Sequence, residues 1–275
     1  MNLFGIFSQI EKTDPEAAEK VSFSRRKLLK TTSVAAAATP LFFAASINKA
    51  FADTPSVVDI LKYALTLEYL ERDFYRAAQF SRGLLPLGTR EYVVQIAKHE
   101  ASHVDLLRGA IPEAQTIKEN TLKFDFTYGG AFPDVLTNYQ TFLAIAQALE
   151  DTGVRAYKGQ AANLLSDPTV LGIALQIHSV EARHAAAVRR MRGIRVWPDA
   201  NDNTLPTSPN VQGAVYAGEN QTMQPNGGGG MVDLMTLPHD SVFNPAMYER
   251  TVYESFDEPL TMEQVLAIAG PFIKS

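Results

Sequence analysis

Residues 99–103 read HEASH and residues 180–184 read VEARH, so a glutamate is twice followed three residues later by a histidine. Residues three apart lie on one face of a helix, with their Cβ atoms about 5–6 Å apart. Apolar residues recur around both motifs at helical spacing, which turns that face toward a core. The pairs Glu100–His103 and Glu181–His184 can therefore each bind one metal ion or help to bridge two.

Two further glutamates lie on apolar helical faces upstream of the motifs. Glu68 precedes Glu100 by 32 residues, and Glu150 precedes Glu181 by 31. The two halves of this region thus repeat one unit, an isolated glutamate followed by a Glu-x-x-His pair. A single Glu-x-x-His arises often by chance, whereas two in matching register are a specific signal.

Four carboxylates that converge in one core need compensation. An unpaired buried carboxylate is so costly that it usually protonates or acquires a partner. At an effective dielectric constant of about 20, two like charges 4 Å apart repel by about 4 kcal/mol. Two divalent cations would cancel four negative charges, and neutral histidines would complete the coordination. The charge balance therefore predicts a pair of metal ions.

The sequence around these motifs predicts four long helices. Helices of this length without intervening β-branched runs are typical of a bundle. Short connections predict two antiparallel hairpins, and the 22 or so residues between the hairpins can cross the full length of a helix. We therefore expect an all-α, ferritin-like four-helix bundle with a long crossover, followed by an irregular tail that ends in a short helix. The expected helices cover residues 55–82, 89–108, 133–165, 168–192 and 262–269.

Composition narrows the classes of function. The 275 residues include no cysteine, which excludes disulfides, Cys-ligated zinc, iron–sulfur clusters and thiol nucleophiles. A net charge of −5 argues against a protein that binds nucleic acid. We expect three parts: a signal over 1–52, the bundle over 53–192, and a loop-rich extension over 193–275 that packs on the bundle.

The first 52 residues resemble a twin-arginine export signal. Arg25 and Arg26 open the motif, an apolar stretch spans residues 34–47, and a small-x-small cleavage pattern occupies residues 50–52. The stretch is shorter than the roughly 20 residues that a spanning helix needs. We expect export to the periplasm or beyond, with cleavage between Ala52 and Asp53. An uncleaved anchor and a chance arginine pair are the alternatives.

With these motifs, residues 55–192 resemble the ferritin-like superfamily, and most closely its desiccation-related and ferritin-2 branch. Stretches 67–71 (LEYLE) and 256–260 (FDEPL) add to the likeness. In ferritin-like di-metal proteins, a glutamate from each of two helices and a Glu-x-x-His from each of the others hold the metals. The resemblance implies that Glu100 and Glu181 bridge the ions and that the other ligands are terminal. Carried over by position, the ligands are Glu68, Glu100, His103, Glu150, Glu181 and His184.

Several residues near the motifs have two interpretations. Glu71 competes with Glu68 as ligand, and we prefer Glu68 because Tyr75 follows it by seven residues, as Tyr157 follows Glu150. Either glutamate could instead lie on a solvated face. The two tyrosines either hydrogen-bond the ligand carboxylates, where they could also stage electron transfer, or only fill the core.

Two histidines flank the motifs. His178 lies three residues before Glu181 and could support the ligands from behind, and His99 lies directly before Glu100. We interpret both as hydrogen-bonded core or surface histidines.

The ligand set favours iron or manganese, with zinc as a competitor. Paired ions of this kind can bind dioxygen or peroxide and exchange two electrons. We therefore expect an exported di-iron or di-manganese oxidoreductase acting on iron(II), dioxygen or hydrogen peroxide, by ferroxidase, peroxidase or catalase chemistry. The alternative is a stress- or desiccation-related structural protein with a structural or vacant metal site. Expected partners are a small-molecule oxidant or metal ion, the export machinery and further copies of the chain, and no nucleic acid.

Overall fold

We describe the protein from a computed structural model that covers residues 55–119, 121–198, 202–206, 211–225, 230–238 and 244–274. The expected twin-arginine signal and its cleavage position before Asp53 lie outside these residues. Among the helices of the described segments, none is both long and apolar enough to cross a membrane.

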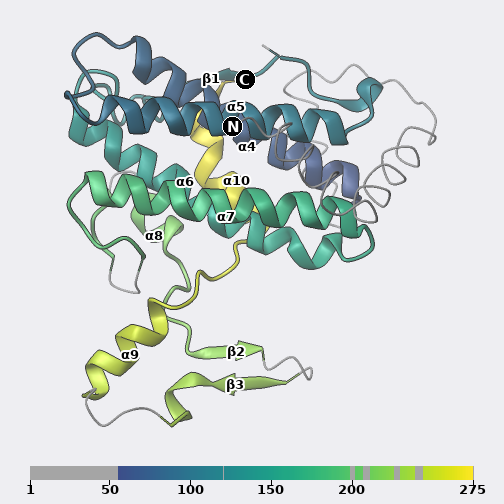
Figure 1. Ribbon diagram of the computed structural model, residues 1–275, viewed down its shortest axis with the longest axis vertical. Helices are drawn as coiled ribbons and strands as arrows, with labels where there is room; N and C mark the ends of the chain where they lie inside the picture. Colours follow the sequence, from purple (N-terminus) through teal and green to yellow (C-terminus); the bar gives the residue numbers. More distant parts are fainter. Residues whose placement is uncertain are drawn as a thin grey trace, which may run out of the picture.

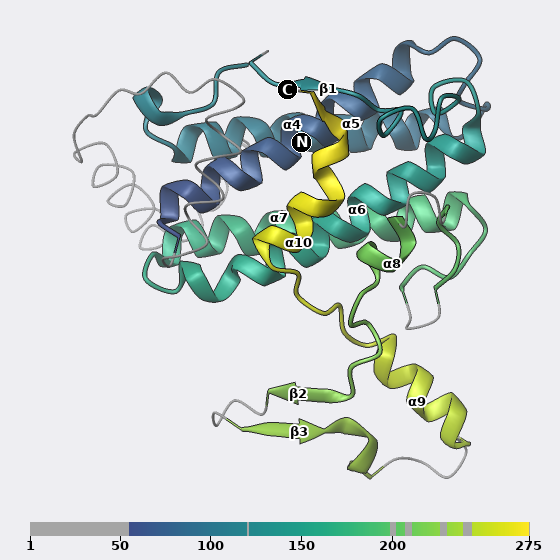
Figure 2. The same ribbon diagram turned by 180° about the vertical axis from the view of Figure 1, so that it is seen from behind.

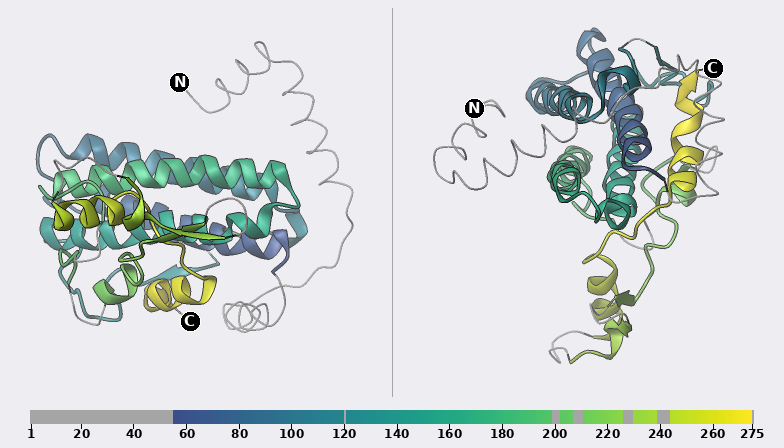
Figure 3. Two further views of the ribbon diagram at one scale, coloured as in Figure 1. Left: turned by 90° about the horizontal axis from the view of Figure 1, so that it is seen from below. Right: turned by 90° about the vertical axis from the view of Figure 1, so that its right-hand side faces the viewer.

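Four long helices form the body of the molecule: α4 (Val57–Phe80), α5 (Arg90–Ala110), α6 (Tyr139–Ala161) and α7 (Pro168–Met191). Helices α4 and α5 pack as one pair and α6 and α7 as the other, and Figure 1 shows the second pair lying beneath the first. The view along the bundle in the right panel of Figure 3 shows all four helices around a common interior. The predicted all-α four-helix bundle of two hairpins is confirmed.

Local capping explains where these helices begin. Asp167 accepts hydrogen bonds from the backbone of Thr169 and Val170, as expected for the cap of α7. The third helix begins six residues later than predicted, because the chain from Pro133 forms turns and Asn138 is the actual cap. A 3₁₀ turn, η2 (Ala162–Leu164), follows α6 directly.

The crossover between the hairpins runs along the bundle and is fixed at its middle. It contains a 3₁₀ turn, η1 (Glu113–Gln115), and a short strand, β1 (Lys123–Phe124). Strand β1 pairs antiparallel with β4 (Ile273–Lys274), so that Phe124 lies opposite Ile273. Two segments far apart in sequence are therefore joined by backbone hydrogen bonds.

An apolar core fills the space between the helices except around the middle. Phe74 of α4 stacks on Phe142 of α6, with ring centroids 5.1 Å apart, and joins the two hairpins. Both rings are fully buried, and burial of such a side chain contributes roughly 1.5–3 kcal/mol. Polar residues replace this packing where the glutamates and histidines lie.

The extension after α7 contains more structure than the loop or extended chain expected for residues 193–260. Helices α8 (Val211–Val215) and α10 (Met262–Ala269) pack on α6, and the η4 turn (Gly270–Phe272) follows α10. The capping box of Thr261 and Gln264 that predicted α10 is present. Figures 1 and 2 show β2 (Met223–Pro225), β3 (Met231–Asp233) and α9 (Pro245–Tyr253) standing away from the bundle, with η3 (Leu234–Thr236) after β3.

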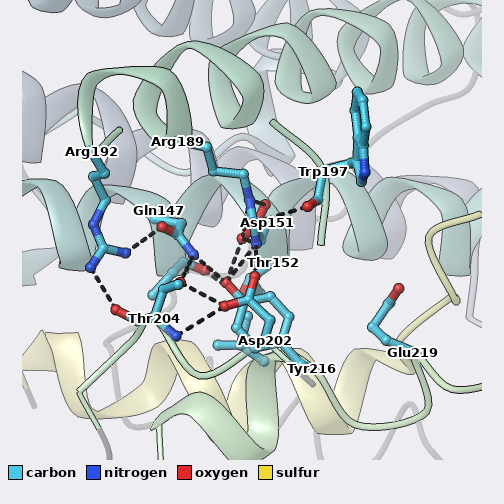
Figure 4. A network of polar contacts seen from close by, with 12 residues as sticks. Gln147, Asp151, Thr152, Arg189, Arg192, Trp197, Asp202, Thr204, Tyr216 and Glu219 are labelled. Atoms are coloured by element: carbon cyan, nitrogen blue, oxygen red, sulfur yellow. Dashed lines mark hydrogen bonds and ion pairs between the residues drawn. The ribbon is translucent and has the colours of Figure 1, made fainter. Parts of the chain in front are cut away.

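Buried charges join the extension to α6 and α7, as Figure 4 shows. Arg189 forms ion pairs with Asp151, at 2.6 Å, and with Asp202 of the extension, at 2.7 Å. The hydroxyl of Tyr216 donates to the same Asp151 carboxylate at 2.6 Å. A second arginine, Arg155, pairs with Glu219 at 2.8 Å. Losing one member of such a buried pair typically costs about 3–5 kcal/mol, so these contacts fix the extension on the bundle.

Candidate metal centre

The four glutamates and two histidines nominated from the sequence meet in the middle of the bundle. Each helix contributes side chains to the middle of the bundle, because the helical spacing of its apolar residues turns one face toward the interior along its whole length. All four glutamates have no exposed surface, and the two histidines are 4–6% exposed. Helix α4 supplies Glu68, α5 supplies Glu100 and His103, α6 supplies Glu150, and α7 supplies Glu181 and His184.

A first group of ligand atoms surrounds Nδ1 of His103. Oε2 of Glu68 lies 3.1 Å away, and Oε2 of Glu100 lies 3.0 Å away. Oε1 of Glu181 also lies 3.0 Å from the same nitrogen. A ring nitrogen carries at most one hydrogen, so it cannot donate a full hydrogen bond to three oxygens. These four atoms, from three helices, are close enough to one another to share one ion.

A second group surrounds Nδ1 of His184. Oε1 of Glu100 lies 2.7 Å from this nitrogen, Oε2 of Glu150 lies 3.4 Å away, and Oε2 of Glu181 lies 3.7 Å away. Glu100 and Glu181 therefore belong to both groups, and each turns one oxygen to either side. This is the arrangement that two bridging and two terminal carboxylates require.

Several of these buried atoms have no partner with hydrogen-bond geometry. Leaving a buried polar atom unpaired costs about 1–3 kcal/mol, and more if the group is charged. Oxygen and imidazole nitrogen atoms are suitable ligands for iron and manganese. The unpaired atoms thus fit a pair of metal ions, one in each group. They are Oε1 of Glu100, Oε2 of Glu150, both carboxylate oxygens of Glu181, and Nδ1 of His184.

Two tyrosines hold the terminal glutamates in place. The hydroxyl of Tyr157 donates to Oε1 of Glu68 at 2.5 Å, and the hydroxyl of Tyr75 donates to Oε1 of Glu150. In both cases the other carboxylate oxygen faces its group of ligand atoms. Each tyrosine is buried, so it fills the core and orients a carboxylate at the same time.

Comparison with known proteins agrees with this geometry. Residues 56–193 match the family of ferritin-like domains, which is half of the chain. The chain belongs to this family. No curated protein and no solved structure matches the chain. The ferritin-like domain of this protein thus carries the buried Glu/His cluster in its interior.

Without metal, protonation of some side chains balances the charges of the Glu/His cluster inside the ferritin-like domain. Burial raises the pKa of Glu68 to about 8, and burial also raises the pKa of Glu150 well above its usual range. Burial acts the same way on Glu181, but the two histidines outweigh it and lower its pKa. The surrounding carboxylates in turn outweigh burial at His103 and His184 and raise the pKa of each ring. The site therefore binds protons tightly in positions that a cation can occupy instead.

Glu71, the alternative ligand on α4, belongs to neither group of ligand atoms. It is nonetheless only 3% exposed, so it does not lie on a solvated face. Gly153 lies beside both Glu71 and the centre: a Cβ atom at Gly153 would lie 3.4 Å from Oε1 of Glu71 and 3.5 Å from Oε2 of Glu181. Burial raises the pKa of Glu71 well above its usual range, with Glu181 adding to the effect. The geometry brings Glu68 into the cluster and keeps Glu71 beside it.

His99 supports the site although we interpreted it as an ordinary histidine. Its Nδ1 lies 2.8 Å from Nε2 of His184, and the two rings are nearly parallel. A hydrogen on Nε2 of His184 that bonds His99 leaves Nδ1 of His184 free to bind a metal. The signal in the sequence was its position four residues before His103, on the same helical face. His178 instead donates from Nδ1 to the backbone oxygen of Val154.

Proposed function

We propose that this protein is an exported di-metal carboxylate oxidoreductase that would hold iron or manganese and act on iron(II), dioxygen or hydrogen peroxide. The observation that carries the proposal is the pair of ligand groups that share Glu100 and Glu181. Five of the eight facing atoms are buried without a hydrogen-bond partner among the described residues, which a purely structural polar core would provide.

A pair of iron or manganese ions supplies two-electron redox chemistry when bound. The residues of the chain bind and orient those ions: His103 and Glu68 on one side, His184 and Glu150 on the other. Tyr75 and Tyr157 prevent the terminal carboxylates from turning away. With iron(II) as substrate, two iron(II) ions, one dioxygen molecule and two protons give two iron(III) ions and one hydrogen peroxide molecule.

Elemental analysis of the purified protein tests this proposal directly. We expect about two iron or manganese ions per chain, because each ligand group fits one. An anomalous-difference map of a crystal should place both within the cluster. The absorption spectrum of the reduced protein should change on exposure to dioxygen or peroxide. Redox-silent zinc, or a protein that stays metal-free when supplied with iron and manganese, would instead identify a structural role.

Export is a separate proposal, supported by the Arg25-Arg26 motif and the apolar stretch behind it. The twin-arginine route carries folded proteins, which would allow the metals to be inserted before export. We expect the double substitution Arg25→Lys and Arg26→Lys to retain the precursor inside the cell. Normal export of this variant, measured by fractionation and immunoblotting, would remove the twin-arginine interpretation.

A further inference from the structure

An apolar cavity of about 20 Å³ lies between the four helices, to one side of the metal centre. It is found where α4 and α7 begin and where α5 and α6 end. A cavity of roughly 10–15 Å³, counted as the space open to the centre of a water-sized sphere, is enough to hold one water molecule. The cavity thus has room for a molecule of two or three atoms. Its lining consists of Ile60, Leu61, Tyr63, Ala64, Leu67, Leu107, Ala156, Tyr157, Gln160, Leu164, Ile173 and Ala174.

The chemistry of the lining disfavours polar occupants. No charged side chain lines the cavity, and its three polar side chains offer little. The hydroxyl of Tyr157 already donates to Glu68, and the oxygen of Gln160 accepts from Asn163. The hydroxyl of Tyr63 is buried and has no hydrogen-bond partner among the described residues. A buried water molecule needs two to four polar partners, whereas apolar cavities stay dry and take up apolar molecules such as xenon.

The cavity is connected to the metal centre through one side chain. The ring of Tyr157 forms part of its wall, and the hydroxyl of that ring contacts Glu68. Ala64 and Leu107 each lie one helical turn from a ligand, Glu68 and His103 respectively, which is about 5–6 Å along the helix.

One lining residue marks the way in from solvent. Ile173 is the only one of the twelve that is partly exposed, and all the others are buried. Ile173 on α7 is therefore the lining residue that solvent reaches most readily.

We propose that this cavity takes up dioxygen and delivers it to the metal centre. The inference rests on the proposed function and narrows it, because an uncharged, nearly dry cavity suits dioxygen better than hydrogen peroxide or a hydrated metal ion. Peroxide and metal ions would reach the centre by another route.

Xenon uptake tests the cavity without relying on catalysis. Crystals of the full chain, metal-free and metal-bound, are pressurised with xenon and the anomalous signal is mapped. We expect one xenon site among Ala64, Ala156 and Ala174, with or without metal. Ala174→Leu should abolish it. The matched control is Ala269→Leu, which fills a separate cavity of about 10 Å³ beside Glu71 and should leave the xenon site unchanged. Absence of xenon from the wild-type cavity would overturn the proposal.

Kinetics test delivery to the centre. In Ala174→Leu we expect the dioxygen concentration for half-maximal iron(II) oxidation to rise about tenfold, equivalent to roughly 1.4 kcal/mol. Oxidation driven by hydrogen peroxide, which consumes two iron(II) ions and two protons per peroxide and yields two water molecules, should be unchanged. Ile173→Trp, at the partly exposed position, should act in the same way if Ala174→Leu does not fold. Metal content and thermal unfolding of each variant serve as checks.

The possible failures are distinguishable. Equal loss with dioxygen and peroxide, or no loss with either, would overturn the proposal of a dioxygen cavity while leaving the oxidoreductase in place. A wild-type protein that binds xenon but oxidises no iron(II) with either oxidant would instead contradict the proposed function.

Discussion

Glu100 and Glu181 differ from the other glutamates because each faces both ligand groups. We expect Glu181→Ala to lose both metal ions, because each group loses an oxygen ligand and only one shared carboxylate, that of Glu100, remains. Glu150→Ala should lose one ion, since Glu150 belongs to the second group only. Elemental analysis of the purified variants measures these losses.

Glu71→Ala is the matched control, because Glu71 is a buried glutamate of the same region outside both groups. It should keep close to the full metal content. Loss of metal in this variant alone would show that the ligand on α4 is assigned to the wrong glutamate.

The raised pKa of Glu68 predicts opposite pH responses of the metal-free and metal-bound protein. Its ordinary pKa of 4.5 rises to about 8 on burial, so folding favours the protonated form. That contribution to stability is complete below pH 4.5 and is lost as the pH rises through about 8. Metal must displace the same proton, so metal affinity should rise toward pH 8, by up to about tenfold per pH unit for each proton released.

Thermal unfolding with and without chelator, between pH 5.5 and 8.5, checks this prediction. The metal-free protein should become less stable across the range, and the stabilisation by metal should grow. A stabilisation by metal that is the same at both ends of the range would contradict the assignment of the displaced proton.

The sequence could predict which side chains enter the core but not which atoms meet there. Helical periodicity, which can be read from a single sequence, predicts that Glu68, Glu100, Glu150 and Glu181 all face the core. The hydrogen bond between His99 and His184 depends on the distance between α5 and α7. Distances between helices are set by packing, so a periodic pattern does not reveal them.

On the scale of elements, a glycine on α6 decides how closely the extension approaches. A Cβ atom at Gly159 would lie 2.0 Å from the backbone oxygen of Leu260, whose nitrogen donates to the backbone oxygen of Arg155. We expect Gly159→Ala to destabilise the protein by roughly 1–3 kcal/mol, because the backbone of the extension must move away. Chemical denaturation measures this change.

Gly172→Ala on α7 is the control for that measurement. Apart from its chain neighbours and the backbone of its own helix, no atom of the described residues lies within 4 Å of a Cβ atom built at Gly172. Alanine should therefore stabilise α7 by about 0.5–1 kcal/mol, in line with its helix propensity. Equal effects of the two substitutions would show that Leu260 does not approach Gly159 as described.

Helix boundaries were predictable where the cap lies within the helix's own sequence. Asp167 and the pair Thr261 and Gln264 marked the starts of α7 and α10 correctly because capping bonds span only two or three residues. The predicted start of α6 was wrong because Pro133 and Asn138 are both residues that commonly begin a helix. The sequence did not predict the short elements of the extension. The extension is stabilised by contacts with segments distant in the sequence, such as the ion pair of Arg189 with Asp202, and a local pattern does not reveal such contacts.

For the molecule as a whole, the buried Glu/His cluster lies between the two hairpins, so a metal bound there would link them. The long helices pack mainly within the pairs α4–α5 and α6–α7, whereas each ligand group draws on both pairs. At a free metal concentration 1,000 times Kd, binding stabilises the folded state by about 4 kcal/mol.

Hydrogen exchange should reveal this link. We expect metal to slow exchange in the middle of all four long helices and to raise the unfolding temperature. Glu181→Ala should show neither change when metal is added. Protection confined to one hairpin would mean that the ions are held by that hairpin alone.

The pairing of β1 with β4 has a consequence for biosynthesis. Strand β4 is translated roughly 150 residues after β1, which takes a ribosome roughly 10 to 30 seconds. During that interval the crossover lacks its partner strand, so the nascent polypeptide can assemble its first hairpin but cannot complete its final topology. Closure of the crossover is therefore a late step in biosynthesis, and a chaperone that acts on this protein before β4 is made would find β1 without its partner strand.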